Sequence, residues 1–301
     1  MYLKKRYKAG QTIEIQKTFS KRYGKKIARG GNVNKTPDAV ANYNKKMAVR
    51  EIGRKINANF GPDDVHMVLR HRKGQDVTPP QAKAMLDKAI RQLRAELRKL
   101  NREIKKKYPG WEEKELKYLR ATAVGERGGI HHHLVINVTE MALLRKAWPY
   151  GSINLTPLYS NGEYSGLAKY FVGQGKGEPG GAIYIEGNLW SGSRNLRKVK
   201  STVERVSAKV WREPPTPEKG YLIDVDSIDP GVNPVTGMPY LFYRMVKINQ
   251  SGPAAEAARQ ANRKAVLHEW AKRYDSRRIQ KFDGQPKRPK GKGPPQAVTG
   301  H

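Results

Sequence analysis

The chain contains no cysteine, and this absence excludes several kinds of site at once. Without thiols it can form no disulfide, no thiolate metal centre and no cysteine nucleophile. Any metal ion must therefore be held by histidine, carboxylate or carbonyl oxygen. The chain also lacks an apolar run of about 18 residues, the length that a membrane-spanning helix needs, and Met1–Arg6 lead into no apolar signal region. We therefore expect a cytoplasmic protein with no membrane partner.

Acidic residues are scarce beside basic ones. Of the 301 residues, 59 are Lys or Arg and 27 are Asp or Glu, which gives a formal net charge of +32. Solubility does not require so large a charge, and a polyanion is its natural partner. Nucleic acid is the first candidate, because neutralising phosphates needs only Lys and Arg. With 37% hydrophobic residues the chain can still bury one good core or two modest ones.

Three of the seven histidines stand together in Gly128–Val138, at the start of an apolar run. If the run is a strand, alternation places His131 and His133 on one face and His132 on the other. Two imidazoles on one face can share a divalent cation, whereas a core strand has no reason to begin with three polar rings. A structural or solvated histidine cluster is the alternative, and the surrounding sequence has to decide between them.

The rest of the pattern predicts an α+β fold with a central, mostly antiparallel sheet and packed helices. A helix begins at Thr36-Pro37-Asp38 and runs to about Asn57, and leucines and isoleucines at steps of four and three predict a long helix after Thr78. Two more helices are expected at 166–172 and 254–274. Strands are expected at 65–69, 115–124, 130–138, 182–185, 219–225 and 239–248. The strands at 115–124 and 130–138 form a predicted antiparallel hairpin.

The order of these parts is strand, long helix, strand, acid-bearing turn, His-x-His strand and a helix with Leu167–Phe171. This order resembles the His-hydrophobic-His endonucleases, and among them the rolling-circle replication initiators of small phages and Gram-positive mobile elements. The stretches that carry the resemblance are Asn57–Pro62, Gly129–His133, Trp148–Gly151, Leu167–Tyr170 and Ser191–Leu196.

The resemblance implies a fold like that of Rep proteins and relaxases, related to the RNA-recognition-motif fold. It also implies a divalent metal, Mg or Mn, on His131 and His133, and a tyrosine nucleophile, for which Tyr170 is the first choice and Tyr164 the second. Attack by the tyrosine on a phosphodiester leaves protein on the 5′ phosphate and a free 3′ hydroxyl for a polymerase. The implied partners are single-stranded or hairpin origin DNA, a host helicase and a host polymerase.

Four further residues join the predicted site. Glu126, on the turn before His131, is the first choice for a third metal ligand, with an exposed turn acid as the alternative. Lys169 is a candidate contact to the scissile phosphate or the phenolate, although adjacent helix residues diverge by about 100°. Arg194 and Asn195 are the predicted DNA-binding residues, and a structural loop role is equally open.

Two positions depart from the family's pattern. His132 stands where the family has a bulky apolar residue, which leaves open which histidine pair binds the metal. Gly173 follows Tyr170 by three residues, where relatives often have a lysine. His66 and His71 approach the metal if their strand neighbours the histidine strand, and otherwise they are core or rim histidines.

The sequence therefore predicts a replication initiator that nicks and rejoins single-stranded DNA at an origin, in a bacterial or phage-infected cell. The predicted endonuclease domain spans 61–250, between a basic extension with one helix at 1–60 and a basic helix with a tail at 251–301. A conjugative relaxase or transposase-type nickase is the nearest alternative. A non-catalytic basic DNA- or RNA-binding protein explains the charge equally well, but it leaves the ordered His-x-His and Lys-Tyr pairs unexplained.

Overall fold

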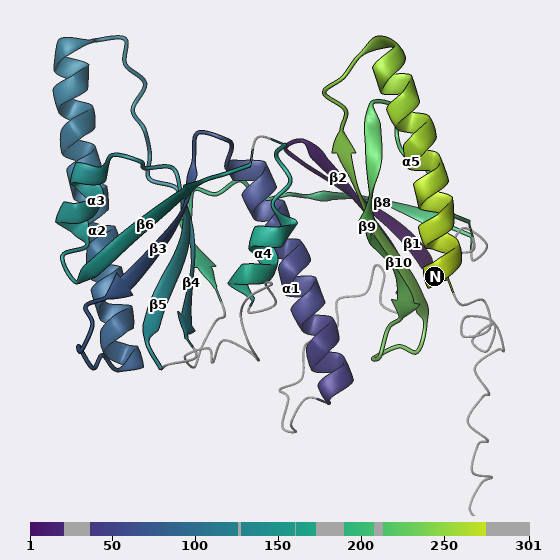
Figure 1. Cartoon of the computed structure of the whole chain (residues 1–301), viewed down its shortest axis with the longest axis horizontal. Helices are drawn as coiled ribbons and strands as arrows, with labels where there is room; N and C mark the ends of the chain where they lie inside the picture. Colours follow the sequence, from purple (N-terminus) through teal and green to yellow (C-terminus); the bar gives the residue numbers. More distant parts are fainter. Residues whose placement is uncertain (21–36, 126–127, 160, 173–189, 208–212, 275–301) are drawn as a thin grey trace, which may run out of the picture.

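The structure is a computed structural model, and it describes residues 1–20, 37–125, 128–159, 161–172, 190–207 and 213–274. Within these ranges the chain forms two five-stranded antiparallel sheets and five helices (Figure 1), which confirms the predicted α+β class. The strand expected at 182–185 lies outside the described residues. None of the helices in the described ranges is long and apolar enough to cross a membrane.

The first sheet has the histidine strand at its centre, in the order β6-β3-β5-β4-β7. β4 and β5 form the predicted hairpin, and β3 lies on the other side of β5 with Val68 opposite His133. The sequence pattern predicts neither β6 nor β7, which form the two edges. The strands of this sheet are β3 Val65–His71, β4 Tyr118–Val124, β5 Ile130–Ile136, β6 Gly151–Pro157 and β7 Ser191–Gly192.

Helices α2 and α3 cover one face of the first sheet (Figure 1). They span Pro79–Lys107 and Met141–Ala147, and the sequence pattern predicts the first of them only. α2 begins at a capping box formed by Thr78 and Gln81, followed by proline in its first turn. Its predicted apolar stripe is buried against the sheet, and each such side chain contributes about 1.5 to 3 kcal/mol. The stripe includes Leu86, Ile90, Leu93 and Leu97.

Helices α1 and α4 cover the opposite face. They span Asp38–Asn59 and Ser165–Phe171, close to the ranges that the sequence predicts. Ile52 and Ile56 of α1 are fully buried in one core cluster with Val135 of β5 and with Phe171 of α4. Gly53 of α1 lies directly against Ala168 of α4, so the two helices pack through small residues. The first sheet therefore places its two faces in different surroundings, and β5 contributes alternate side chains to each.

The second sheet joins the two ends of the described chain, in the order β8-β1-β2-β10-β9. Helix α5, Gly252–Arg273, packs on one face of it through Val266 and Trp270. The sequence pattern predicts β9, β10 and α5, but not the first two strands or β8. The strands are β1 Tyr2–Ala9, β2 Thr12–Phe19, β8 Ser201–Val206, β9 Tyr221–Val232 and β10 Pro239–Lys247.

Helix α1 lies between the two sheets (Figure 1). Toward the second sheet it directs Arg54, which donates to the buried carboxylate of Glu14 at 2.8 Å. The turn between β1 and β2 meets the end of the same helix: Gly10 has φ +56, and a Cβ atom there would lie 2.0 Å from the carbonyl oxygen of Asn57. Only glycine fits this close approach. The second sheet is thereby fixed to the helix that also covers the histidine strand.

Candidate active site

The side chains of β5 alternate between two surroundings, as strand geometry requires. His131 and His133 lie on the face covered by α1 and α4, with ring centroids 4.9 Å apart. His132 lies on the other face, where its Nδ1 is 2.8 Å from Oγ1 of Thr122 and its ring contacts Trp148. His132 is completely buried, whereas His131 is partly exposed.

His66 joins the first pair, because β3 does neighbour the histidine strand. Its Nε2 lies 3.2 Å from Nδ1 of His133, and the two rings are stacked with centroids 5.4 Å apart. His71, at the end of the same strand, faces the other way and lies against His132 and Trp148. The five histidines of this sheet therefore divide into a group of three, His66, His131 and His133, and a pair on the opposite face.

Burial keeps the inner histidines of this group uncharged at neutral pH. Burial lowers the pKa of His66 to about 4 and that of His133 to about 3. For His133 the neighbouring charges of His131, His66 and Arg70 act in the same direction. Neutral imidazole carries the lone pair that a metal ion requires, so both rings are in the form that binds metal.

The two facing ring nitrogens have the spacing of ligands to one ion. Nitrogens about 2.1 Å from a shared ion lie about 3.0 to 3.4 Å apart at octahedral or tetrahedral angles, and His66 and His133 meet at 3.2 Å. In the part of the chain that the structure describes, no three His, Asp or Glu side chains converge as a complete metal site. Glu126, the predicted third ligand, lies outside the described residues. The imidazoles thus fit part of a divalent metal shell, with other positions left to water, substrate or Glu126.

Tyr170 lies beside this group, on α4. Its ring centroid is 5.3 Å from that of His133 and 6.4 Å from that of His66, in edge-on contacts. The neighbouring Ala168 and Phe171 are buried in the core between α4 and α1, while Tyr170 itself is partly exposed. The buried neighbours hold the short helix in place, and the phenol remains accessible beside the histidines.

Tyr164, the second-choice nucleophile, is a core residue. Its side chain is completely buried, and its hydroxyl donates to the backbone carbonyl of Tyr159 at 2.9 Å. Its backbone N–H donates to Asn57 of α1, so it fixes the start of α4. This packing leaves Tyr164 no route to a DNA phosphate.

Lys169 points away from the histidines, as its position next to Tyr170 on a helix predicts. It is exposed and lines a cavity of about 710 Å³ between α1, α4 and the second sheet, together with Asp226, Asp229 and Arg244. None of the described residues that line this cavity is a histidine. The structure therefore does not bring Lys169 into the site of Tyr170.

Arg194 and Asn195 lie at the other end of the sheet. Gly192 pairs with Leu119 of β4, whereas His131 pairs with Ala123, four residues further along the same strand. Four residues of a strand span about 13 Å. Asn195 donates to the carboxylate of Glu115 and to the carbonyl of Leu116, which ties the segment after β7 to the start of β4. Its contacts are those of a structural loop residue, while Arg194 is exposed.

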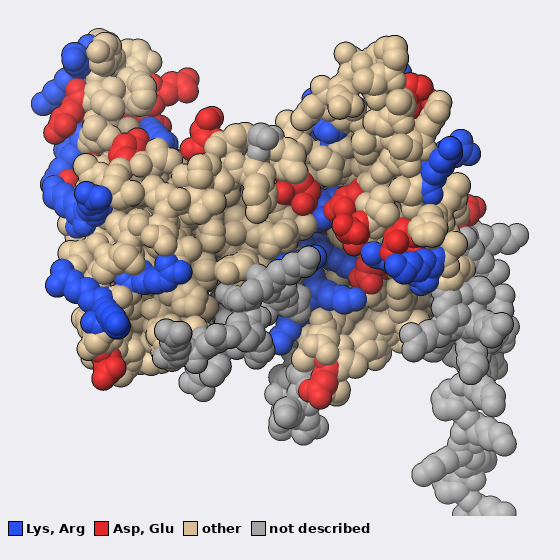
Figure 2. Space-filling model, viewed as in Figure 1, with Lys and Arg blue, Asp and Glu red and all other residues tan. Residues whose placement is uncertain are grey.

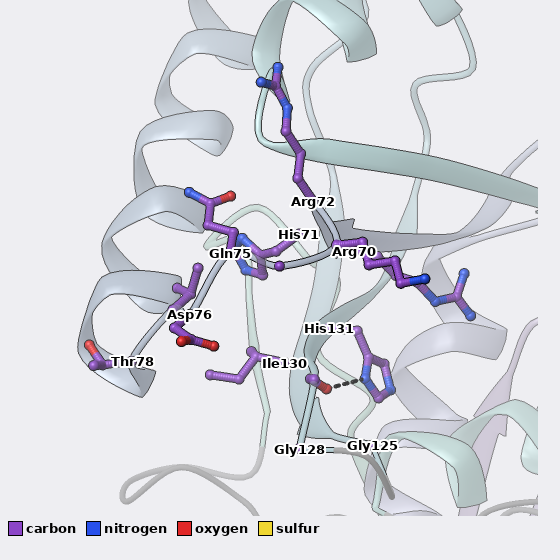
Figure 3. A pocket seen from close by; sticks show the side chains of 14 residues that line it. Arg70, His71, Arg72, Gln75, Asp76, Thr78, Gly125, Gly128, Ile130 and His131 are labelled. Carbon is purple, nitrogen blue, oxygen red and sulfur yellow. Dashed lines mark hydrogen bonds between the residues drawn. The ribbon is translucent and has the colours of Figure 1, made fainter.

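A basic cavity of about 1180 Å³ opens beside His131, where β3 ends and the β4–β5 turn approaches (Figure 3). Its wall includes Arg70, Arg72 and Lys73 and the backbone of the turn at Gly128, which has φ +77. Arg70 lies directly opposite His131 in the β3–β5 register, so the two side chains share a face. The sequence offers no signal for Arg70 and Lys73 until the pairing of β3 with β5 is known.

Residues 67–174 match the model of a protein family described as Replication-associated protein, of the ORF2 type. The matched span includes α2 to α4, most of β3, all of β4 to β6, and the residues His131, His133 and Tyr170. No curated protein and no solved structure matches the chain.

Proposed function

Over residues 67–174 the chain is a Rep-type, replication-associated protein, and from this premise we propose that it nicks and rejoins single-stranded DNA. The observation that carries the proposal is the contact between a partly exposed tyrosine and a group of imidazoles on one sheet face. Tyr170 and His133 meet at a ring separation of 5.3 Å. Among the tyrosines weighed as the nucleophile, Tyr164 is enclosed in the core.

In the proposed reaction Tyr170 attacks a DNA phosphate. A bond forms between the phenolic oxygen and phosphorus, the bond from phosphorus to the 3′ oxygen breaks, and the phenolic proton passes to the departing 3′ oxygen. The protein is left on the 5′ phosphate, and the free 3′ hydroxyl is the end that a polymerase extends. One phosphodiester replaces another of similar energy, so reversal of the step rejoins the strand without an external energy source.

We infer that His131 and His133, together with His66, hold a divalent ion, Mg or Mn. When bound, such an ion withdraws charge from a phosphodiester oxygen and makes phosphorus more electrophilic. His66 and His133 support this role because burial keeps both rings neutral at physiological pH. Glu126 remains the expected third ligand.

The basic cavity beside His131 suits the DNA strand that leads to the tyrosine. Arg70 and Lys73 supply positive charge on its wall, and exposed guanidinium and ammonium groups bind phosphates. Such contacts position the backbone without reading its sequence. The proposed substrate is thus single-stranded or hairpin DNA at a replication origin, with a helicase and a polymerase of the host acting before and after the nick.

A covalent-capture experiment tests the proposal. The full chain is incubated with Mn²⁺ and a pool of random-sequence single-stranded DNA labelled at the 3′ end, then denatured in sodium dodecyl sulfate. A labelled adduct is expected on the wild-type protein, and it should vanish in Tyr170→Phe. Tyr159→Phe is the matched control, because this side chain is 60% exposed and lies outside the site. Sequencing of the captured DNA identifies the preferred nick site.

Three outcomes decide the matter. An adduct that depends on Tyr170 and on Mn²⁺ supports the proposed reaction. An adduct that persists in Tyr170→Phe contradicts the assignment of the nucleophile. No adduct on the wild-type protein, also with DNA taken from beside its own gene, favours a DNA-binding protein without nicking activity.

A further inference from the structure

The outer face of α2 carries a straight row of basic side chains. Lys88, Arg91, Arg98 and Arg102, here called the basic stripe, recur at steps of three, seven and four residues and are all exposed. This spacing places them on one side of the helix, opposite the buried leucines that pack on the sheet. From the first to the last, the stripe extends about 21 Å along the helix axis. Figure 2 shows Lys and Arg along the left edge of the molecule, where α2 lies in Figure 1.

The acidic residues of α2 lie off the stripe. Asp87 accepts from Arg120 of β4, and Glu96 accepts from Lys146 of α3, so both serve contacts on the flanks of the helix. None of the four stripe residues forms an ion pair with a described residue. Like charges three and four residues apart repel and destabilise a helix. The stripe therefore adds nothing to the stability of α2, and its charges are free for an external partner.

The stripe has the chemistry of a surface for a rigid polyanion. Surfaces that bind single-stranded nucleic acid combine cations with aromatic side chains on which bases stack. The stripe contains no aromatic residue, and the position between Arg91 and Arg98 is the small Ala95, which lets the helix approach a backbone closely. Duplex DNA is a stiff rod with one negative charge per about 1.7 Å of its axis, and a straight helix with aligned cations matches it. We propose that the basic stripe of α2 binds the phosphate backbone of double-stranded DNA.

The position of the stripe separates it from the proposed nicking site. α2 packs on the sheet face that holds His132, whereas Tyr170 and the His66, His131 and His133 group lie on the opposite face. A duplex on the stripe therefore cannot contact the tyrosine at the same point of the strand. The stripe gives the protein a hold on the duplex next to the single-stranded region, and this binding does not depend on the nicking activity.

Binding of a short, blunt duplex of arbitrary sequence, followed by fluorescence anisotropy, tests the inference. The stripe variant is K88Q/R91Q/R98Q/R102Q, since glutamine keeps the helix propensity and removes the charge. The control variant, R259Q/R263Q/K264Q/K272Q, removes the same charge from exposed positions of α5. Affinities are measured in the full chain between about 50 and 200 mM KCl, because the slope of log K against log salt is about −0.9 per phosphate contact.

The stripe variant is expected to lose about 3 to 4 units of this slope and at least tenfold in affinity, with the control close to wild type. Circular dichroism verifies that both variants keep their helix content. Equal losses in the two variants would overturn the inference, because they would reflect net charge alone. A loss confined to single-stranded DNA would overturn the choice of duplex. Adduct formation by Tyr170 on single-stranded DNA should be unchanged in the stripe variant, and its absence in the wild-type protein would contradict only the nicking proposal.

Discussion

The Nε atom of Arg244, on β10, lies 3.2 Å from Oε1 of Glu163, immediately before α4. The same guanidinium donates to Asp224 of β9 and to the hydroxyl of Ser165. Glu163 in turn accepts from the backbone N–H and the hydroxyl of Ser165, in the first turn of α4. The helix that bears Tyr170 is therefore tied to the second sheet by a largely buried cluster of charges.

Replacing Arg244 by Met should lower the free energy of unfolding by about 3 to 5 kcal/mol, because it leaves the carboxylates of Glu163 and Asp224 without their cation. Urea denaturation measures this change. Arg244→Lys should recover only part of the loss, since an ammonium cannot reproduce the planar guanidinium fork. Arg259→Met is the control: its pair with Glu256 is exposed on both sides, so a change within about 0.5 kcal/mol is expected. Equal losses in both variants would mean that the cluster does not hold the two layers together.

Removing the imidazole of His66 should weaken Mn²⁺ binding by about tenfold or more, because one of two facing nitrogen ligands is lost. Electron paramagnetic resonance of free Mn²⁺ measures the affinity without DNA and without turnover. His71→Ala is the matched control, since this histidine lies at the end of the same strand but faces His132. Unchanged binding in His66→Ala would show that the stacked pair is not a metal site.

Substituting leucine for His132 should leave adduct formation on single-stranded DNA within about threefold of wild type, whereas alanine at His131 or at His133 should abolish it. His132 is completely buried and its Nδ1 is 2.8 Å from Thr122, so the change replaces one core contact by another. The covalent-capture assay measures all three variants. The reverse pattern would place the metal on the pair His71 and His132 instead.

Lys17 of β2 should make stability depend on pH in the alkaline range. Burial lowers its pKa to about 8, against about 10.4 in an unfolded chain. Below pH 8 the ammonium is charged in both states and its burial is unfavourable. Between about pH 8 and 10.4 the unfolded chain binds more protons, so this group adds stability as the pH rises.

Lys17→Met should therefore be more stable than wild type at about pH 7, and this advantage should shrink at about pH 9.5. Urea midpoints of the two proteins at both pH values measure the effect, and the comparison cancels the tyrosines that titrate in the same range. An advantage that does not change with pH would mean that the ammonium is not desolvated in the folded protein.

Local patterns in the sequence were sufficient to predict the parts of the fold that carry their own signal. The long helix α2 has six apolar residues at helical spacing, and the β4–β5 hairpin has two apolar runs around a glycine-rich turn. The division of His131 and His133 from His132 follows from strand alternation alone. The family match supports the resemblance that these local patterns indicate.

The remaining features depend on contacts between distant segments. β1 and β2 have lysines and arginines between their apolar residues, and Ile13 and Ile15 are buried only because β10 and α5 cover them. The contribution of His66 depends on which strand lies beside β5, and so does that of Arg70. Lys169, Arg194 and Asn195 are near the motif in sequence but point elsewhere or lie at the far end of β4, which a linear pattern cannot indicate.

The strand order of the second sheet has a consequence for synthesis of the protein. β1 and β2 are made first, but their neighbours β8 and β10 come about two hundred residues later, after the whole of the histidine sheet. Such distant pairing forms slowly and late. While the chain is still on the ribosome, the histidines can already be in place, but Arg244 has not yet arrived to hold α4. We expect the nucleophile to be fixed only when translation is nearly complete, so that unfinished chains cannot cut DNA.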